Sequence, residues 1–202
     1  MRRSNAYGGG AGAAYDGGAK GALFWPVLMI VALLDAATKW LAVSNLIPQR
    51  MPHDIMGEWL RFTLVRNPGA AFGLHVGPYS RWIFMILTIV ALFILGRLYQ
   101  ATKSGEVTRV LSLALVCGGA VGNLVDRIRS DLGVVDFIDI GVGDARWPTF
   151  NIADMAVSIG AFLLAWILWG EDSEVDTGAE PVALAPSNAI ASRVAGDSGD
   201  VS

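Results

Sequence analysis

Four long apolar stretches, separated by polar connections, dominate the pattern of hydrophobic and polar positions along the chain. They run over about 23–43, 81–98, 107–126 and 152–169. A helix needs about 20 apolar residues to cross the hydrocarbon core of a bilayer. The second stretch is short, but Arg81 and Arg97 at its ends can extend their side chains to the two interfaces. We therefore predict four transmembrane helices.

The connections between these stretches fall on two sides of the membrane. With four spans, both termini share one side with the short connection at 98–106, and the connections at about 44–80 and 126–152 share the other. Positive charges do not decide which side is cytoplasmic, because basic residues are equally frequent on both. The segment Arg61–Arg66 alternates polar and apolar residues, which favours a short strand. The predicted fold is an all-α polytopic membrane protein with a small sheet or loop subdomain.

The two ends of the chain differ from its centre in composition. Residues 1–21 are rich in Gly and Ala without periodicity and predict a flexible arm. Residues 171–202 hold seven acidic residues against Arg193 and predict a disordered tail. Residues 22–170 then form the membrane domain. The chain is 53% hydrophobic and only 16% charged, against about a quarter charged in soluble proteins.

Residue usage argues against several classes of site. Cys117 is the single cysteine, which excludes an intrachain disulfide and a cysteine-based metal site; in its apolar surroundings we expect a small buried hydrophobe. His53 and His75 are the only histidines and no HExxH spacing exists, so we expect neither a metal nor a cofactor. No basic cluster is dense enough to predict a nucleic-acid partner.

Polar residues within the first and third stretches require an explanation, because ionisable groups are costly inside a membrane. Asp35 and Lys39 are one helical turn apart. They form either an internal ion pair or a support for a polar site at the end of the helix. Asn123, Asp126 and Arg127 share one helix face, where an Asp–Arg pair is usually structural and an arginine can also hold a lipid phosphate. Both interpretations stay open for each group.

Two glycines precede that polar face. Gly118 and Gly122 form a GxxxG pattern, which ordinarily indicates close packing of helices.

Two further aspartates lie at or near the fourth stretch. Asn151 suits an N-cap, and Asp154 then falls at the third helical position, which makes an approximate capping box. Asp136 lies in an apolar part of the preceding connection, and taken alone it is a turn or edge residue.

Taken together, these polar residues belong to one side of the membrane in the four-span topology. Two carboxylates brought close cannot both ionise readily, so one pKa rises, and such a pair activates a water molecule for amide hydrolysis. Spacing alone leaves Asp126 an equal candidate for the pair. A small transporter or channel with an Asp/Lys relay is the alternative, but it predicts polar residues at all membrane depths. A non-catalytic scaffold packed through GxxxG leaves Asp136 and Asp154 unexplained.

Five sequence blocks resemble, in order, those of the lipoprotein signal peptidase (signal peptidase II) family. They are Asp35-Ala-Ala-Thr-Lys39, Asn67-Pro-Gly-Ala-Ala-Phe72, Gly118-Gly-Ala-Val-Gly-Asn-Leu-Val-Asp-Arg127, Val134-Val-Asp-Phe137 and Phe150-Asn-Ile-Ala-Asp154.

The resemblance implies an aspartic-type endopeptidase that cleaves the signal peptide from diacylglyceryl-modified prolipoproteins, before the lipidated cysteine. It implies a multi-pass enzyme of the bacterial inner membrane with cytoplasmic termini, an extracytoplasmic sheet subdomain and the site at the outer leaflet. The expected partners are lipid-modified prolipoproteins and membrane lipids, and we expect a monomer.

Carried over position by position, the resemblance also assigns roles to residues. The catalytic pair is Asp136 and Asp154. The implied substrate-binding residues are Asn67, Asn123, Arg127 and Asn151, and the implied supporting residues are Asp35, Lys39, Gly69 and Asp126. Because Asp154 lies in a first helical turn, where the dipole favours an anion, we expect Asp136 to carry the shared proton more often.

Overall fold

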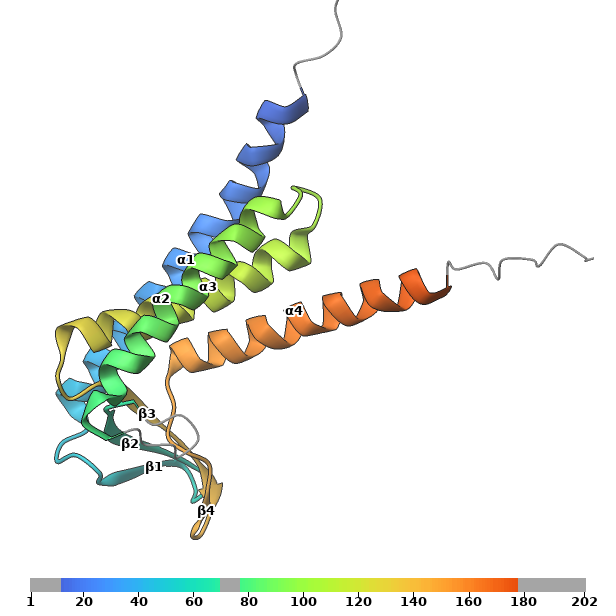
Figure 1. Ribbon diagram of the computed structural model, residues 1–202. Coiled ribbons are helices and arrows are strands. Elements are labelled where there is room, and N and C mark those ends of the chain that lie inside the picture. The colour runs from blue at the N-terminus through green and yellow to red at the C-terminus, as the bar shows by residue number, and fades with distance from the viewer. Residues whose placement is uncertain (1–11, 70–76, 178–202) are drawn as a thin grey trace, which may run out of the picture. The chain divides into compact units, whose positions relative to one another are not determined.

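The computed structural model of the 202-residue chain describes residues 12–69 and 77–177 (Figure 1). The elements, in chain order, are α1 (Gly12–Asn45), β1 (Pro52–Met56), β2 (Leu60–Asn67), a 3₁₀ turn (Gly77–Tyr79), α2 (Ser80–Ala101), α3 (Val107–Arg129), β3 (Val134–Val142), β4 (Ala145–Arg146) and α4 (Ile152–Thr177). Each of the four α-helices contains a segment long and apolar enough to cross a membrane. The predicted four-span helical fold with a small sheet is confirmed.

The ends of the helices differ from the predicted boundaries. The helix α1 begins at Gly12, so part of the segment expected to be an arm is helical. Similarly, α4 continues to Thr177, into the segment expected to be a tail. The rest of both segments, 1–11 and 178–202, lies outside the described residues. The chain divides into two compact units, Met1–Ile167 and Leu168–Ser202. The sheet and the first sixteen residues of α4, up to Ile167, belong to the first unit.

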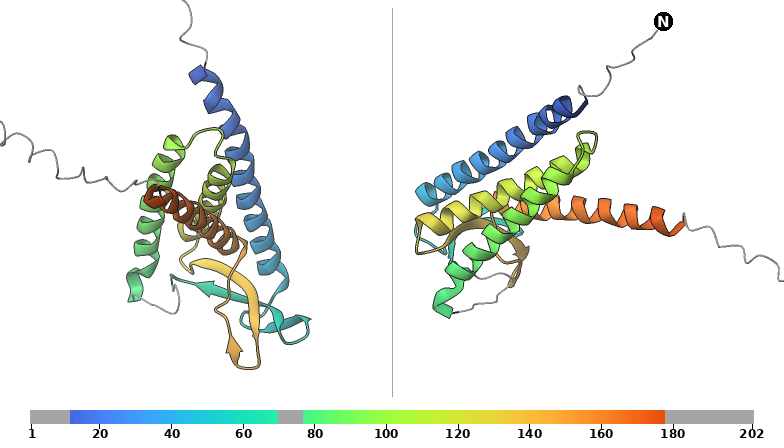
Figure 2. Two further views of the ribbon diagram at one scale, coloured as in Figure 1. Left: turned by 90° about the vertical axis from the view of Figure 1, so that its right-hand side faces the viewer. Right: turned by 45° about the horizontal axis from the view of Figure 1, so that its top comes forward.

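Small residues of α3 allow its neighbours to approach closely. A Cβ atom added at Gly118 would lie 2.9 Å from the Val31 side chain and 3.0 Å from the Leu28 carbonyl oxygen, both of α1. On another side of α3, a Cβ at Gly119 would overlap the Ala153 carbonyl oxygen of α4. Gly118 of the GxxxG pattern therefore packs against α1, as the sequence predicts, whereas Gly119, outside the pattern, packs against α4, so that α3 lies between α1 and α4 (Figure 2).

The surfaces of these helices divide into a shared core and an apolar exterior. Phe24 of α1 packs with Leu113 and Cys117 of α3, and Cys117 is buried as expected. Outward-facing residues of α2, including Phe93 and Ile94, are exposed and apolar, which suits contact with lipid.

The strands form one antiparallel sheet in the order β1-β2-β3-β4. The predicted strand at Arg61–Arg66 is confirmed as part of β2. The structure corrects the placement of Asp136, which lies within β3 rather than in a loop or turn, because β2 supplies the pairing partner at Val65. Leu64, Val135 and Phe137 pack against Ala42 near the end of α1, so the sheet is anchored to the helices.

Candidate active site

Lys39 is the centre of a buried ionic cluster. Its Nζ lies 2.7 Å from Asp35 Oδ2 and 2.9 Å from Asp126 Oδ2, and it donates a 2.9 Å hydrogen bond to Asn123 Oδ1. The side chains of Lys39 and Asp35 are only 4% and 1% exposed. One ammonium group thus offsets two carboxylates that would be costly to bury alone.

The same cluster connects the helices to the start of β3 and of α4. Asp35 Oδ1 accepts a 2.9 Å hydrogen bond from the backbone N–H of Ala153, in the first turn of α4. Asp126 Oδ2 accepts a 3.2 Å hydrogen bond from the backbone N–H of Val135, directly before Asp136. Asp35 and Lys39 therefore form an internal ion pair. Asp35 and Asp126 also bind backbone groups beside Asp154 and Asp136, so the two interpretations left open by the sequence are compatible.

Asp154 caps the helix that carries it. The Asn151 side chain accepts a 2.9 Å hydrogen bond from the Asp154 backbone N–H, and Asp154 Oδ2 accepts a 3.2 Å hydrogen bond from the Asn151 backbone N–H. The second carboxylate oxygen, Oδ1, accepts a 2.7 Å hydrogen bond from Asn123 Nδ2. The capping box predicted from the sequence is present, and it leaves one oxygen of Asp154 for another partner.

Asp136 is almost fully buried, with 2% of its surface exposed. Its oxygens accept hydrogen bonds from Asn67 Nδ2 at 3.1 Å and from Asn151 Nδ2 at 2.8 Å. Burial, followed by repulsion from the Asp154 carboxylate, raises the pKa of Asp136 to about 7, although both amide bonds oppose this rise. A protonated Asp136 can donate a hydrogen bond or a proton at neutral pH.

Asn151 connects the two aspartates. Its side chain is completely buried, and its Nδ2 contacts Asp136 Oδ1, Asn123 Oδ1 and the Val135 carbonyl oxygen. The backbone N–H of the same residue binds Asp154. Asn151 therefore fixes the position of Asp136 in β3 relative to Asp154 in α4. The spacing of these residues in the sequence does not reveal this arrangement.

Two further residues expected at the site, Arg127 and Gly69, both lie close to Phe84 of α2. The Arg127 guanidinium donates a 3.2 Å hydrogen bond to the Asn123 carbonyl oxygen and lies over the Phe84 ring, 5.8 Å from its centroid. Gly69 donates its backbone N–H to Asn67 Oδ1 at 3.0 Å. Its φ of 120° and a hypothetical Cβ only 2.9 Å from Phe84 restrict this position to glycine.

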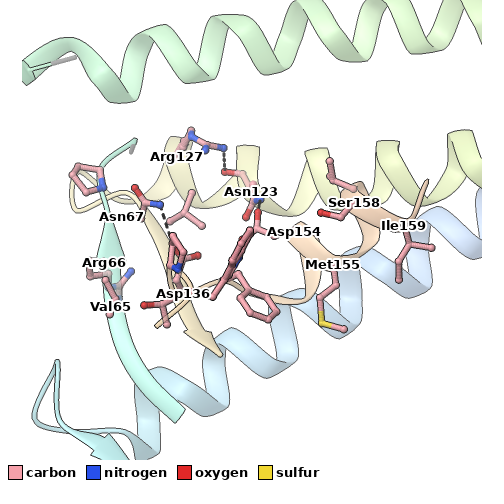
Figure 3. A pocket seen from close by; sticks show the side chains of 17 residues that line it. Val65, Arg66, Asn67, Asn123, Arg127, Asp136, Asp154, Met155, Ser158 and Ile159 are labelled. Carbon is pink, nitrogen blue, oxygen red and sulfur yellow. Dashed lines mark hydrogen bonds between the residues drawn. The ribbon is translucent and has the colours of Figure 1, made fainter. Parts of the chain in front are cut away.

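A cavity of about 990 Å³ contains both aspartates in its wall (Figure 3). Asn67, Asn123 and Arg127 line it beside Asp136 and Asp154. The wall continues along α4 through a second set of residues, Met155, Val157, Ser158 and Ile159. A polar region with two carboxylates thus opens onto the side of a membrane-spanning helix.

The structure brings the sequence-derived candidates into two adjoining groups. Asn67, Asn123, Arg127, Asp136, Asn151 and Asp154 meet around the carboxylate pair, and Asp35, Lys39 and Asp126 form the ionic cluster behind it. Asp126, an equal candidate on spacing, is instead engaged by Lys39.

Sequence reasoning missed several residues of the cavity wall. Val157 and Ser158 follow Asp154 by three and four residues, the spacing of one helix face, which could have identified them. Arg66 directly precedes Asn67, and Trp147 precedes α4. No signal in the sequence distinguishes these two from ordinary sheet or interface residues.

Comparison with known proteins identifies the family. The family model described as Signal peptidase (SPase) II matches residues 27–170. The chain belongs to the signal peptidase II family. It is thus a membrane peptidase of the aspartic type. A small transporter with an Asp/Lys relay is accordingly not what this chain is.

Individual relatives and solved structures agree with this assignment. The peptidase is 38% identical over 148 residues to a lipoprotein signal peptidase of Polynucleobacter necessarius, covering 72% of this chain and 86% of the relative. It is 41% identical to that of Halothermothrix orenii, covering 74% and 97%. A bacterial membrane enzyme structure obtained by the in meso method at 2.3 Å resolution superposes with a TM-score of 0.65 at 28% identity, covering 77% and 92%. A second, at 1.9 Å, gives 0.61 at 30% identity, covering 70% and 89%.

Proposed function

We propose that this peptidase removes the signal peptide from prolipoproteins whose cysteine, directly after the cleaved bond, carries a diacylglyceryl group. The observation that carries the proposal is the placement of Asp136 and Asp154 in the wall of one cavity that extends along a membrane-spanning helix. Relatives named lipoprotein signal peptidase support the substrate class.

In the proposed reaction, Asp136 and Asp154 activate a water molecule without a covalent intermediate. The Asp154 carboxylate, at the positive end of α4, takes a proton from the water molecule while the oxygen of that water attacks the scissile carbonyl carbon. Protonated Asp136, whose pKa lies at about 7, gives its proton to the carbonyl oxygen. As the tetrahedral intermediate collapses, its C–N bond breaks and the leaving amine takes the proton held by Asp154. One hydroxyl of the intermediate returns a proton to Asp136, so the new carboxyl group leaves and the pair returns to its starting state.

The neighbouring residues are proposed to hold the substrate and the pair. Asn67, Asn123 and Asn151 fix the carboxylate oxygens through their amides, and Arg127 binds acceptor oxygens of the substrate. Asp35, Lys39, Gly69 and Asp126 support this arrangement from behind.

The shape of the cavity fits a substrate that remains partly in the membrane. The signal helix would lie along the apolar α4 wall formed by Met155, Val157 and Ile159, while the lipid chains stay in the bilayer. Only the scissile bond then needs to reach the polar pair.

The proposal includes a location and an oligomeric state. The site lies at the ends of the spans where the two long connections meet, and we place that end at the outer leaflet of the bacterial inner membrane, with both termini cytoplasmic. We also propose that the catalytic unit is a monomer, because Asn67, Asn123, Asp136 and Asp154 build both carboxylates and amide partners for each of them.

The experiment compares a diacylglyceryl-modified prolipoprotein with its unmodified form as substrates of the purified protein. We expect cleavage of the modified form alone, and its loss in Asp136→Asn and Asp154→Asn. Asp144→Asn is the matched control, because Asp144 is exposed on the turn between β3 and β4 and does not line the cavity. Equal cleavage of both substrates, or undiminished cleavage by either variant, would refute the proposal.

A further inference from the structure

Arg66 is a cavity residue for which the mechanism above gives no role. It lies in β2 directly before Asn67 and pairs in register with Val135, the residue before Asp136 (Figure 3). It lines the same cavity as the two aspartates. A permanently charged guanidinium therefore stands in the wall of the site, one residue away from a side chain that binds Asp136.

Among the described residues, the Arg66 side chain forms no ion pair, unlike two other arginines of the sheet. Within the part of the chain that the structure describes, its Nε is buried and has no hydrogen-bond partner, a feature that it shares with Arg127 of the same cavity wall. Arg61 of the same strand forms an ion pair with Asp54 at 2.8 Å, and Arg146 of β4 forms one with Asp139. A guanidinium in a cavity wall without a carboxylate partner can pair, through its Nη groups, with an acceptor supplied by the bound molecule.

The position of Arg66 indicates which part of a substrate would supply that acceptor. Met155 and Ile159 form the cavity wall along α4, which is the place proposed for the signal helix. Arg66 belongs to β2, in the sheet, and Asp136 and Asp154 contribute to the wall between these two regions. With the scissile bond at the aspartate pair, the chain that follows this bond leads toward the sheet.

We propose that Arg66 is a specificity-determining residue that binds a carboxylate on the first residues after the lipidated cysteine. This inference rests on the proposed function, since it takes the orientation of the substrate from it. Guanidinium–carboxylate hydrogen bonds are charge-assisted and about twice as strong as neutral ones, so an acidic side chain at this position favours binding and a basic one opposes it.

The test uses three diacylglyceryl-modified prolipoproteins that differ only in the residue after the lipidated cysteine, which is Asp, Asn or Lys. For the unsubstituted peptidase we expect kcat/KM to fall in that order, by about tenfold from Asp to Lys, mostly through KM. In Arg66→Gln the three values should converge. In Arg66→Glu the order should reverse, so that the Lys substrate is cleaved faster than the Asp substrate.

Two further variants separate specificity from folding. Arg66→Lys keeps the charge but not the planar pair of donors, so it should retain the order with a smaller spread. Arg61→Gln removes a partly buried arginine of the same strand that does not line the cavity, and it should keep the full preference.

Three results would overturn the inference. They are equal cleavage of the three substrates by the unsubstituted peptidase, a preference retained in Arg66→Gln, and the same order in Arg66→Glu. Each of these leaves the proposed function intact, because the substrates are still cleaved. If none of the three substrates is cleaved, the proposed function itself fails.

Discussion

Asn151 and Asp154 exchange two hydrogen bonds, each side chain accepting from the backbone N–H of the other residue. Asp154 uses only Oδ2 for this exchange, and its Oδ1 accepts from Asn123. The capping role and the proposed catalytic role therefore do not compete for the same atom. The cap also holds the carboxylate at the positive end of α4, where the helix dipole favours its charged form.

This division of oxygens makes the two roles of Asp154 separable by substitution. Asp154→Asn retains an oxygen that can cap the helix and removes the charge, so we expect a melting temperature in detergent close to that of the unsubstituted protein and no measurable cleavage. Asp154→Ala removes the cap as well and should lower the free energy of unfolding by about 1 kcal/mol. Thermal unfolding and cleavage of a lipid-modified prolipoprotein, measured on the same preparations, check both.

One outcome would contradict a catalytic role for Asp154. If Asp154→Asn cleaves at a rate comparable to the unsubstituted protein, the carboxylate charge has no catalytic part and the residue is only a cap.

The pH dependence of cleavage should follow the protonation of Asp136. Its pKa is raised to about 7 by burial and by the nearby Asp154 carboxylate, so the proton required for acid catalysis is present below this pH and lost above it. We expect kcat/KM to fall as pH rises through about 7. Measurement of cleavage between pH 5 and pH 9, with a fixed ionic strength, checks this prediction.

The same shift predicts the effect of pH on stability. The folded state keeps the Asp136 proton up to about pH 7, whereas an unfolded chain releases it near 3.8. The contribution of this group to stability is therefore fully present below pH 3.8 and is lost as pH rises to about 7. Asp136→Asn cannot titrate, so it should show a smaller fall in melting temperature between pH 4.5 and pH 8. An equal fall in both proteins would show that Asp136 is not the responsible group.

The transmembrane architecture could be predicted from the sequence because hydrophobic length is a local property. The segment around Leu113 needs no distant partner to be apolar and helical, and the alternation at Arg61–Arg66 is likewise local. The capping pair of Asn151 and Asp154 lies within four residues, so its geometry follows from helix periodicity.

The remaining features depend on contacts between distant segments. Asp136 becomes a strand residue only through pairing with Val65, and neither segment signals the other. The choice of Asp136 over Asp126 as a candidate is likewise supported by Lys39, which lies in a different helix and engages Asp126. The resemblance to a family supplied that choice, whereas spacing did not. Arg66 could not be identified, because its place in the cavity wall follows only from the three-dimensional structure.

Removal of the Lys39 charge should destabilise the protein more than any surface change. Lys39→Met leaves the carboxylates of Asp35 and Asp126 without their common cation, and breaking a buried ion pair typically costs about 3–5 kcal/mol. We expect a large fall in melting temperature and in the yield of folded protein. Lys103→Met is the control, because Lys103 is exposed in the connection after α2 and should change neither quantity.

A double substitution shows whether the pair itself is responsible. Asp35→Asn combined with Lys39→Met removes one of the unpaired charges, so it should be less destabilising than the sum of the two single changes. Additive effects would mean that the two residues act independently, contrary to the 2.7 Å contact between them.

Gly122 of α3 lies so close to Asp35 that the added methyl group of an alanine should not fit there. A Cβ at Gly122 would lie 2.5 Å from Asp35 Oδ2, whereas a Cβ at Gly96 of α2 would have no neighbour within 4 Å. We expect Gly122→Ala to lower stability by about 1–3 kcal/mol, and Gly96→Ala to raise it by up to about 1 kcal/mol, because alanine is the better helix former. Thermal unfolding of both variants in one detergent gives the comparison.

Displacement of Asp35 would also disturb its bond to the Ala153 N–H at the start of α4, so cleavage by Gly122→Ala should fall as well. Equal stability of the two variants would mean that the approach of α3 to Asp35 is looser than 2.5 Å implies.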